Sequence, residues 1–263
     1  MISDISQRQE PDWLKLVARI GYGAKGIVYL LIGILTAEGS RGSDSKDAFS
    51  TIAQQPFGTF LLALVAVGLL AYASWRFLQG ITDPEREGSD ASALAKRLAW
   101  VASGIVYVAL AISAGQIIFG AASGGGAQDW TAKVLHWPFG RWLIGAVGLG
   151  IFGGGVHQLK EAISTGFKED FALHKMNSTE KTWATRVGRI GYASRSVVYF
   201  LIAWFLVQSA LTANPSEAGG LAKALNTLQS QPYGPWLLGL TSLGLMCYGL
   251  YCFVMARYRK AVA

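Results

Sequence analysis

The sequence predicts an all-α membrane protein whose six transmembrane helices form three parallel helical hairpins around a pseudo-threefold axis. The first observation behind this prediction is composition: of 263 residues, 52% are hydrophobic and 15% are charged, which excludes an ordinary soluble domain. The second is an internal repeat that occurs three times and contains two long apolar segments each time. Because a helix needs about 20 apolar residues to cross a bilayer, each segment predicts one crossing.

Two sequence blocks define each repeat. The first block reads RIGYGAKGIVY from Arg19, RLAWVASGIVY from Arg97 and RIGYASRSVVY from Arg189. The second reads QPFGTFLLALVAVGLLAY from Gln55, WPFGRWLIGAVGLGIFGG from Trp137 and QPYGPWLLGLTSLGLMCY from Gln231. The blocks place the spans at about 16–37, 57–79, 98–120, 139–160, 190–212 and 235–256. They divide the chain into repeat 1 at 13–90, repeat 2 at 91–163, a connector at 164–188 and repeat 3 at 189–263.

Short amphipathic segments lie outside the spans. One precedes each even-numbered span and ends at a proline, namely KDAFSTIAQQP, QDWTAKVLHWP and LAKALNTLQSQP. Each predicts one or two helical turns on the membrane, after which the proline opens the next helix. The connector at 164–188 mixes Phe167, Phe171, Leu173 and Met176 with charged residues, which predicts a cytoplasmic helix lying at the membrane interface.

The distribution of basic residues predicts the orientation. Of the 23 Lys and Arg residues, 18 lie on the two termini, the second and fourth connections and the adjoining helix ends. Because cytoplasmic segments carry an excess of Lys and Arg, both termini are predicted to be cytoplasmic. Acidic residues before the first apolar run argue against a cleavable signal, so the first span is expected to be an uncleaved anchor. The basic side favours anionic membrane lipids as partners, rather than nucleic acid.

The repeat pattern resembles a known family. Odd-numbered spans with a GYxxxGxVY-like motif, then an amphipathic stretch, QPFG and a Gly-rich even-numbered span, resemble the bacterial family called domain of unknown function 1206. Six blocks match in order over nearly the whole chain, and repeat 2 departs at Ala99, Trp100 and Trp137. The resemblance implies a multi-pass protein of the bacterial inner (plasma) membrane. It implies no activity and supplies no catalytic residues.

A candidate anion or ligand site lies on the odd-numbered spans. Lys25, Ser103 and Arg195 occupy equivalent positions, and Tyr29, Tyr107 and Tyr199 follow four residues later on the same helix face. An ionisable residue inside a membrane span is by default a functional-site hypothesis. Two interpretations are open: the two cations converge on an anion with the tyrosines as donors, or they reach outward to lipid phosphates.

A second candidate, a polar notch, lies in repeat 2. Here the even-numbered span carries His157 and Glu161 where repeat 1 has Trp75 and Gln79. A His–Glu pair four residues apart could form a proton-responsive notch near Arg76, or it could be a histidine satisfied by its neighbour at the interface.

Several chemistries have no sequence support. GxSxG, P-loop and HExxH motifs are absent, and no catalytic residue is assigned. The three histidines fall on different parts of the predicted topology, so neither a metal nor any other cofactor is expected. Cys247 and Cys252 are expected to be membrane-buried thiols.

Three functional hypotheses follow. The first is a non-enzymatic conduit or receptor for a small anion or amphiphile, with a basic and aromatic cytoplasmic vestibule. The second is a scaffold or accessory subunit of a larger membrane complex, and both a homo-oligomer and a different membrane-protein partner fit it. The third is a lipid-modifying enzyme that uses His157 and Glu161 as an acid–base pair. The sequence favours it least, because no nucleophile is evident beside these two residues.

Overall fold

The computed structural model of the chain describes residues 12–37, 49–50, 52–54, 57–82, 90–120 and 127–259. Within these ranges the chain is all-α, and six helices are long and apolar enough to cross a membrane. They are α1 (Asp12–Ala37), α3 (Gly58–Thr82), α4 (Ala91–Ile118), α6 (Gly140–Ser164), α7 (Ser178–Thr212) and α9 (Gly234–Tyr258). The prediction of six candidate membrane helices in three repeats is therefore confirmed.

Helix α7 begins earlier than the span predicted at 190–212. The side chain of Asn177 accepts a hydrogen bond from the amide of Glu180 at 2.8 Å, and the Glu180 carboxylate accepts one from the amide of Asn177 at 2.9 Å. This reciprocal capping box satisfies two amides that a helix start otherwise leaves unpaired. Helix formation therefore extends into the segment that the sequence had assigned to the connector.

The amphipathic stretches before the last two even-numbered helices are helical as predicted, as α5 (Ala127–Leu135) and α8 (Leu221–Gln229). The following membrane helices begin at Gly140 and Gly234, two residues after the proline that was expected to open them. A Cβ atom at either glycine would collide with the backbone of the preceding short helix, at Val134 and Gln229 respectively. Close backbone approach explains why glycine follows the Pro-aromatic pair.

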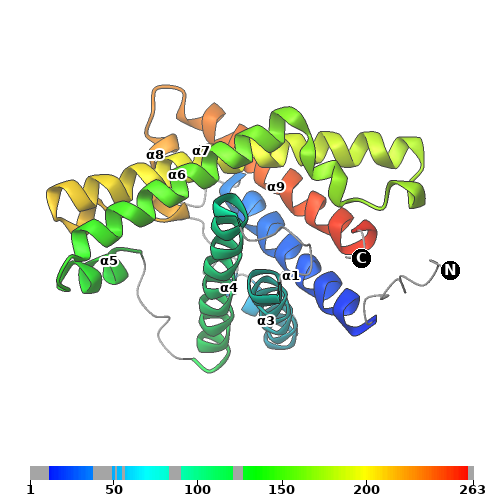
Figure 1. The fold of residues 1–263 in the computed structure, drawn as a ribbon, viewed down its shortest axis with the longest axis horizontal. Coiled ribbons are helices and arrows are strands. Elements are labelled where there is room, and N and C mark those ends of the chain that lie inside the picture. Colours follow the sequence, from blue (N-terminus) through cyan, green and yellow to red (C-terminus); the bar gives the residue numbers. More distant parts are fainter. Residues whose placement is uncertain are drawn as a thin grey trace.

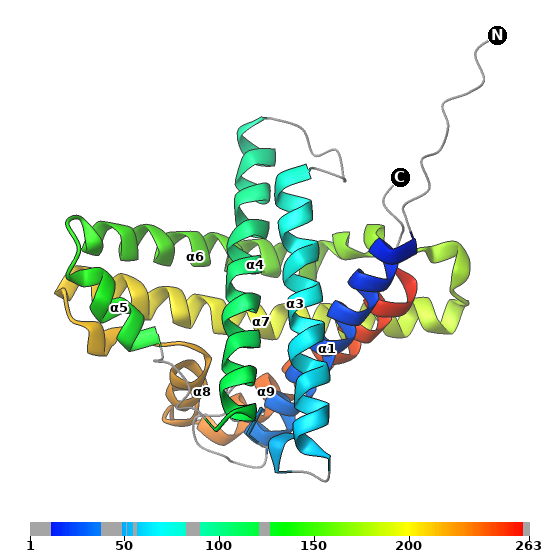
Figure 2. The ribbon, with the colours of Figure 1, turned by 90° about the horizontal axis from the view of Figure 1, so that it is seen from below.

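The six helices pack mainly in three pairs. Figure 1 shows α6 and α7 side by side, and Figure 2 shows this pair running crosswise to the pair α3–α4, with α1 and α9 oblique to both. In addition, α1 packs against α3 and α7 packs against α9, so repeats 1 and 3 are hairpins. Among the described residues, α4 and α6 are not a packed pair. The prediction of a packed hairpin in repeat 2 is therefore wrong.

Repeat 2 lacks a tyrosine–glycine contact that joins the two helices of repeats 1 and 3, and this explains the separation of α4 and α6. We call the tyrosine the knob and the glycine the hole of this contact. In repeat 1 the backbone of Gly21 approaches Tyr72 so closely that a Cβ atom would lie 2.7 Å from the Tyr72 Cα. Gly191 and Tyr248 make the same contact in repeat 3, also at 2.7 Å. Repeat 2 has an alanine and a glycine at these two positions, Ala99 and Gly154. The aromatic knob is lost and the glycine hole is filled, so α4 and α6 have no corresponding contact.

The connector packs into the protein instead of forming one amphipathic helix. It forms two short 3₁₀ helices, η1 (Gly166–Asp170) and η2 (Leu173–Lys175), before α7 begins. Phe167, Phe171 and Met176 are buried in the main hydrophobic core, whereas Leu173 is exposed. The amide of Ala172 donates to the carbonyl of Tyr258 at 2.7 Å, which fastens the connector to the end of α9. Three of the four apolar residues that predicted membrane contact are therefore used for internal packing.

Candidate functional site

The centre of the helix assembly holds a lysine that is buried far from either helix end. Lys25 lies midway along α1, about 20 Å from each end at 1.5 Å per residue, and its side chain is 3% exposed. Its ammonium group donates to the hydroxyl of Tyr72 on α3 at 3.0 Å. It also lies 4.7 Å from the centre of the Tyr72 ring, 5.4 Å from that of Tyr107 and 5.2 Å from that of Tyr248. These contacts replace water with aromatic faces and one hydroxyl.

A second cation meets Lys25 at the same hydroxyl. Arg76 lies one helical turn beyond Tyr72 on α3, and its Nε and Nη2 atoms donate to the Tyr72 oxygen at 2.9 and 2.6 Å. Its Nη1 atom donates to the side-chain oxygen of Gln79 at 3.0 Å. The Tyr72 oxygen therefore accepts three N–H groups from two cations, which makes it the most heavily used acceptor of the cluster.

The third cation, Arg195, comes from the middle of α7 and is 6% exposed. Its guanidinium carbon lies 4.1 Å from the centre of the Tyr248 ring, the same ring that Lys25 contacts, and 5.3 Å from that of Tyr29. Its Nη2 atom donates to the hydroxyl of Tyr199 at 2.6 Å. The buried Nε atom has no hydrogen-bond partner among the described residues. When the side-chain amide of Gln158 on α6 is oriented with its oxygen toward Arg195, that oxygen accepts hydrogen bonds from Nη1 and Nη2 of Arg195 at 3.3 and 3.2 Å.

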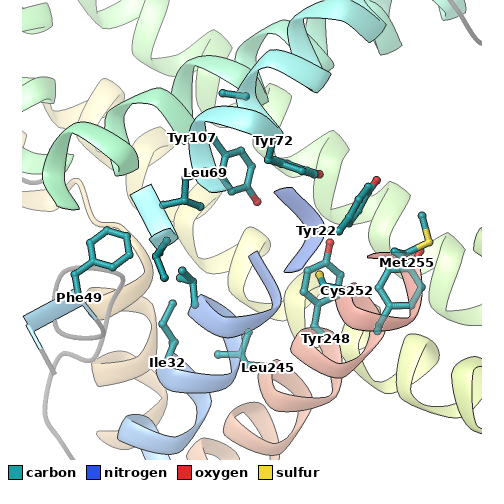
Figure 3. Packing of buried hydrophobic residues seen from close by; sticks show 14 of the residues in the cluster. Tyr22, Ile32, Phe49, Leu69, Tyr72, Tyr107, Leu245, Tyr248, Cys252 and Met255 are labelled. Atoms are coloured by element: carbon teal, nitrogen blue, oxygen red, sulfur yellow. The ribbon is translucent and has the colours of Figure 1, made fainter. Parts of the chain in front are cut away.

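Tyrosine rings join these cations into one cluster, which we call the cation–tyrosine cluster: Lys25, Arg76, Arg195, Tyr29, Tyr72, Tyr107, Tyr199 and Tyr248. The rings of Tyr72, Tyr107 and Tyr248 come together from three helices (Figure 3). The ring pairs Tyr72–Tyr107 and Tyr29–Tyr248 meet edge-to-face with centroids 4.6 and 4.8 Å apart. Within the described part of the chain, none of the three cations pairs with a carboxylate.

Five of the six residues predicted for the anion site lie together in this cluster. Lys25 and Arg195 point inward, so the alternative in which they reach outward to the lipid surface does not apply. Tyr29, Tyr107 and Tyr199 surround them. The sixth predicted residue, Ser103, is half-buried on α4 and has no hydrogen bond among the described contacts.

The predicted polar notch is not assembled. His157 is exposed on α6, and it has no hydrogen bond to Glu161 within the described residues. The Glu161 side chain lies over Gly166 at the start of η1, with one buried oxygen that has no partner among the described groups. Arg76 belongs to the cation–tyrosine cluster and contacts neither residue.

Tyr72, Tyr248 and Gln158 were not predicted as site residues. Tyr72 and Tyr248 end the second block of repeats 1 and 3, so their recurrence was a signal that could have been used. Arg76, Gln158 and Cys252 are equivalent positions in the three repeats, but their different side chains hid the correspondence. Which of these side chains lies near Lys25 and Arg195 depends on which helices become neighbours.

Comparison with known proteins assigns the family. The family model described as Domain of Unknown Function (DUF1206) matches residues 20–83, 98–165 and 190–259, which correspond to the three repeats. The chain belongs to the DUF1206 family. It is also 35% identical to "Uncharacterized protein YxxB" of Bacillus subtilis (strain 168), over 98% of this chain and 95% of that protein. No solved structure is significantly similar to the DUF1206 chain.

Proposed function

We propose that this DUF1206 protein is a non-enzymatic membrane receptor or conduit for a small anion or for the anionic head of an amphiphile. The observation that carries the proposal is the cation–tyrosine cluster, in which two buried cations, Lys25 and Arg195, and the half-buried Arg76 contact the same group of tyrosines without a carboxylate partner in the described residues. A single Lys or Arg at the centre of a membrane helix costs about 2.5–3.5 kcal/mol on insertion scales. An anion that binds among the three cations would offset part of that cost.

The tyrosines suit the same role. Their rings stabilise the cations by about 0.5–2 kcal/mol for each close contact, and their hydroxyl groups can donate hydrogen bonds to an anion. The unpartnered Nε atom of Arg195 supplies a further buried donor. By contrast, His157 is exposed and makes no hydrogen bond to Glu161 within the described residues, which gives no support to a lipid-modifying enzyme.

Recurrent contacts support the proposed threefold arrangement of the repeats. The Nε atom of Arg97 on α4 donates to the carbonyl of Gly80 on α3 at 2.9 Å. At the equivalent position on α7, Arg189 donates to the carbonyl of Ala162 on α6 at 3.0 Å. In both cases the even helix of one repeat meets the odd helix of the next, and α9 meets α1 in the same sense. We propose that this interface generates the pseudo-threefold axis.

Anion binding and flux test the proposed function. Purified protein would be titrated calorimetrically with chloride and with inorganic phosphate, and anion flux would be measured in liposomes. We expect the double variant Lys25→Met/Arg195→Met to bind at least about tenfold more weakly, because it loses two charged donors. Lys160→Met, which removes an exposed cation at the end of α6, should behave as wild type. If the protein binds neither chloride nor inorganic phosphate, and anion flux equals that of empty liposomes, the proposal is refuted.

The proposed orientation has both termini on the cytoplasmic side of the bacterial inner membrane. The even number of candidate membrane helices and the excess of basic residues near the termini support it. Reporter fusions to the two ends should be active only with a cytoplasmic reporter. Activity of a periplasmic reporter at the C-terminus would reverse the assignment.

One observation favours the scaffold as a second candidate. Gly68 and Gly244 contact the neighbouring helix of their hairpins, whereas the equivalent Gly150 on α6 has no side-chain neighbour within 4 Å. A helix of another membrane protein, or of a second copy, could pack there. Cross-linking in native membranes through a photoreactive residue at position 150 should then capture a stoichiometric partner, and capture of lipid alone would reject this role.

A further inference from the structure

The side chain of Tyr72 is bound in the way that a ligand oxygen would be bound. Arg76 presents its Nε and Nη2 atoms, and both donate to the single Tyr72 oxygen, at 2.9 and 2.6 Å. The ammonium group of Lys25 donates to the same oxygen at 3.0 Å. This edge of a guanidinium group matches two oxygens of a phosphate or carboxylate group. One phenol oxygen thus occupies a donor set that fits an oxyanion.

The equivalent part of repeat 3 is arranged differently. Arg195 occupies the position that Lys25 has in repeat 1, and Tyr248 the position of Tyr72. Arg195 stacks on the Tyr248 ring at 4.1 Å and uses its Nη2 atom for Tyr199 at 2.6 Å. Its Nε atom, on the same edge of the guanidinium group, is buried and has no partner among the described residues. Repeat 1 therefore satisfies its donors with its own tyrosine, and repeat 3 retains a donor that is not used.

Resting on the proposed function, we propose that the cation–tyrosine cluster binds a phosphate group and that Tyr72 is its gating residue. The Tyr72 hydroxyl holds the place of one phosphate oxygen between Lys25 and Arg76 until the ligand displaces it. The remaining phosphate oxygens then accept from Arg195. Lys25 and Arg195 both contact the Tyr248 ring, at 5.2 and 4.1 Å from its centre, so a ligand that reaches both cations would lie next to this shared ring.

The phosphate group could belong to free inorganic phosphate or to the head of an anionic lipid. Two guanidinium groups favour an oxyanion over a halide, because each presents a planar edge with two parallel N–H bonds. A lipid with a phosphomonoester head and free phosphate offer the same oxygens to these donors. The two sources differ only in the acyl chains, so they are separated by experiment.

The decisive variant is Tyr72→Phe, which removes the competing oxygen and retains the ring that both cations contact. It should bind a phosphate group about tenfold more tightly than wild type, because the ligand no longer has to displace hydrogen bonds to charged groups. Tyr192→Phe is the matched control, since it removes the hydroxyl of a half-buried tyrosine that, among the described residues, bonds only to Tyr251, at 3.2 Å. This control should leave the affinity unchanged.

Detergent-purified protein would be titrated calorimetrically in two arms, one with inorganic phosphate and one with short-chain phosphatidic acid. Tighter binding by Tyr72→Phe in either arm supports the gate, and the arm in which it occurs identifies the source of the phosphate. Equal or weaker binding than wild type in both arms overturns the gate. Binding of chloride but of neither phosphate compound overturns the ligand class and leaves the proposed function standing. Binding of no anion by either protein refutes both.

A second variant keeps the proposal testable should Tyr72→Phe fail to fold. Arg76→Lys retains the charge but loses the pair of parallel N–H groups on one planar edge. It should weaken phosphate-group binding about tenfold and change chloride binding little, because a halide does not use paired donors. Equal losses for phosphate and chloride would show that Arg76 acts only as a charge, which overturns the proposed oxyanion geometry.

Discussion

Repeats 1 and 2 carry the same two sequence blocks, yet one closes into a hairpin and the other does not. In repeat 1 the Cβ atom of Ala24 lies where a side chain at Gly68 would have to go, so α1 and α3 are in close contact. The equivalent glycine of repeat 2, Gly150, has nothing within 4 Å of its missing side chain. A shared motif therefore specifies a helix and its small-residue face, but one knob-and-hole pair decides whether that face is used within the repeat.

The interfaces between repeats are preserved where the interface inside repeat 2 is lost. The arginine-to-carbonyl hydrogen bonds of Arg97 and Arg189 join consecutive repeats with nearly the same length, 2.9 and 3.0 Å. Both helices of repeat 2 thus remain anchored to their neighbours. Separation of α4 and α6 does not leave either helix without a packing partner.

The largest loss of stability is expected where the connector packs against the hairpin of repeat 3. Repeat 2 has no such hairpin. Phe167 is 3% exposed, stacks on Tyr192 of α7 and meets Tyr251 of α9 edge-to-face. Phe167→Ala should lower the free energy of unfolding by about 3–5 kcal/mol, the usual cost of truncating a buried aromatic residue. Leu173→Ala, on the exposed side of the connector, is the control. Chemical unfolding in detergent measures both, and equal losses would show that the connector is not packed as described.

An intermediate effect should distinguish the two repeats directly. Gly68→Ala forces a methyl group against Ala24 and should destabilise the protein by about 1–3 kcal/mol, as overpacking does. Gly150→Ala meets no neighbour and should be neutral, or stabilising by up to about 1 kcal/mol through helix propensity. Thermal unfolding of the two variants is the measurement. If Gly150→Ala were as damaging as Gly68→Ala, α4 and α6 would have to be packed after all.

The smallest effect concerns the early start of α7, which gives repeat 3 a longer first helix than repeat 1. Asn177→Ala removes the side chain that caps Glu180 and should cost about 0.5–2 kcal/mol. Thr179→Ala, in the first turn but without a capping role, is the comparison variant. Hydrogen exchange of the α7 amides before residue 188 should increase in Asn177→Ala alone. An unchanged exchange rate would mean that tertiary contacts, and not the cap, fix the helix start.

Part of the cation–tyrosine cluster could be predicted from the sequence. Periodicity placed Lys25 and Tyr29 on one face of α1, and alignment of the blocks placed Arg195 and Tyr199 at equivalent positions on α7. Tyr72 and Arg76 come from α3, and their approach to Lys25 is a contact between residues 47 positions apart in one case. No periodicity within a helix can report which residue of another helix faces it.

The sequence by itself determined the number of membrane helices, their approximate limits and the threefold repetition, because length, hydropathy and internal similarity are local properties of the chain. Only the tertiary structure decided that α4 and α6 separate, that the aromatic connector residues turn inward and that Lys25 and Arg76 meet at the Tyr72 hydroxyl. Several helix faces have a similar composition, so composition does not specify which faces pack together. Close contacts between residues far apart in the sequence, such as Gly21 against Tyr72, decide which helices pack.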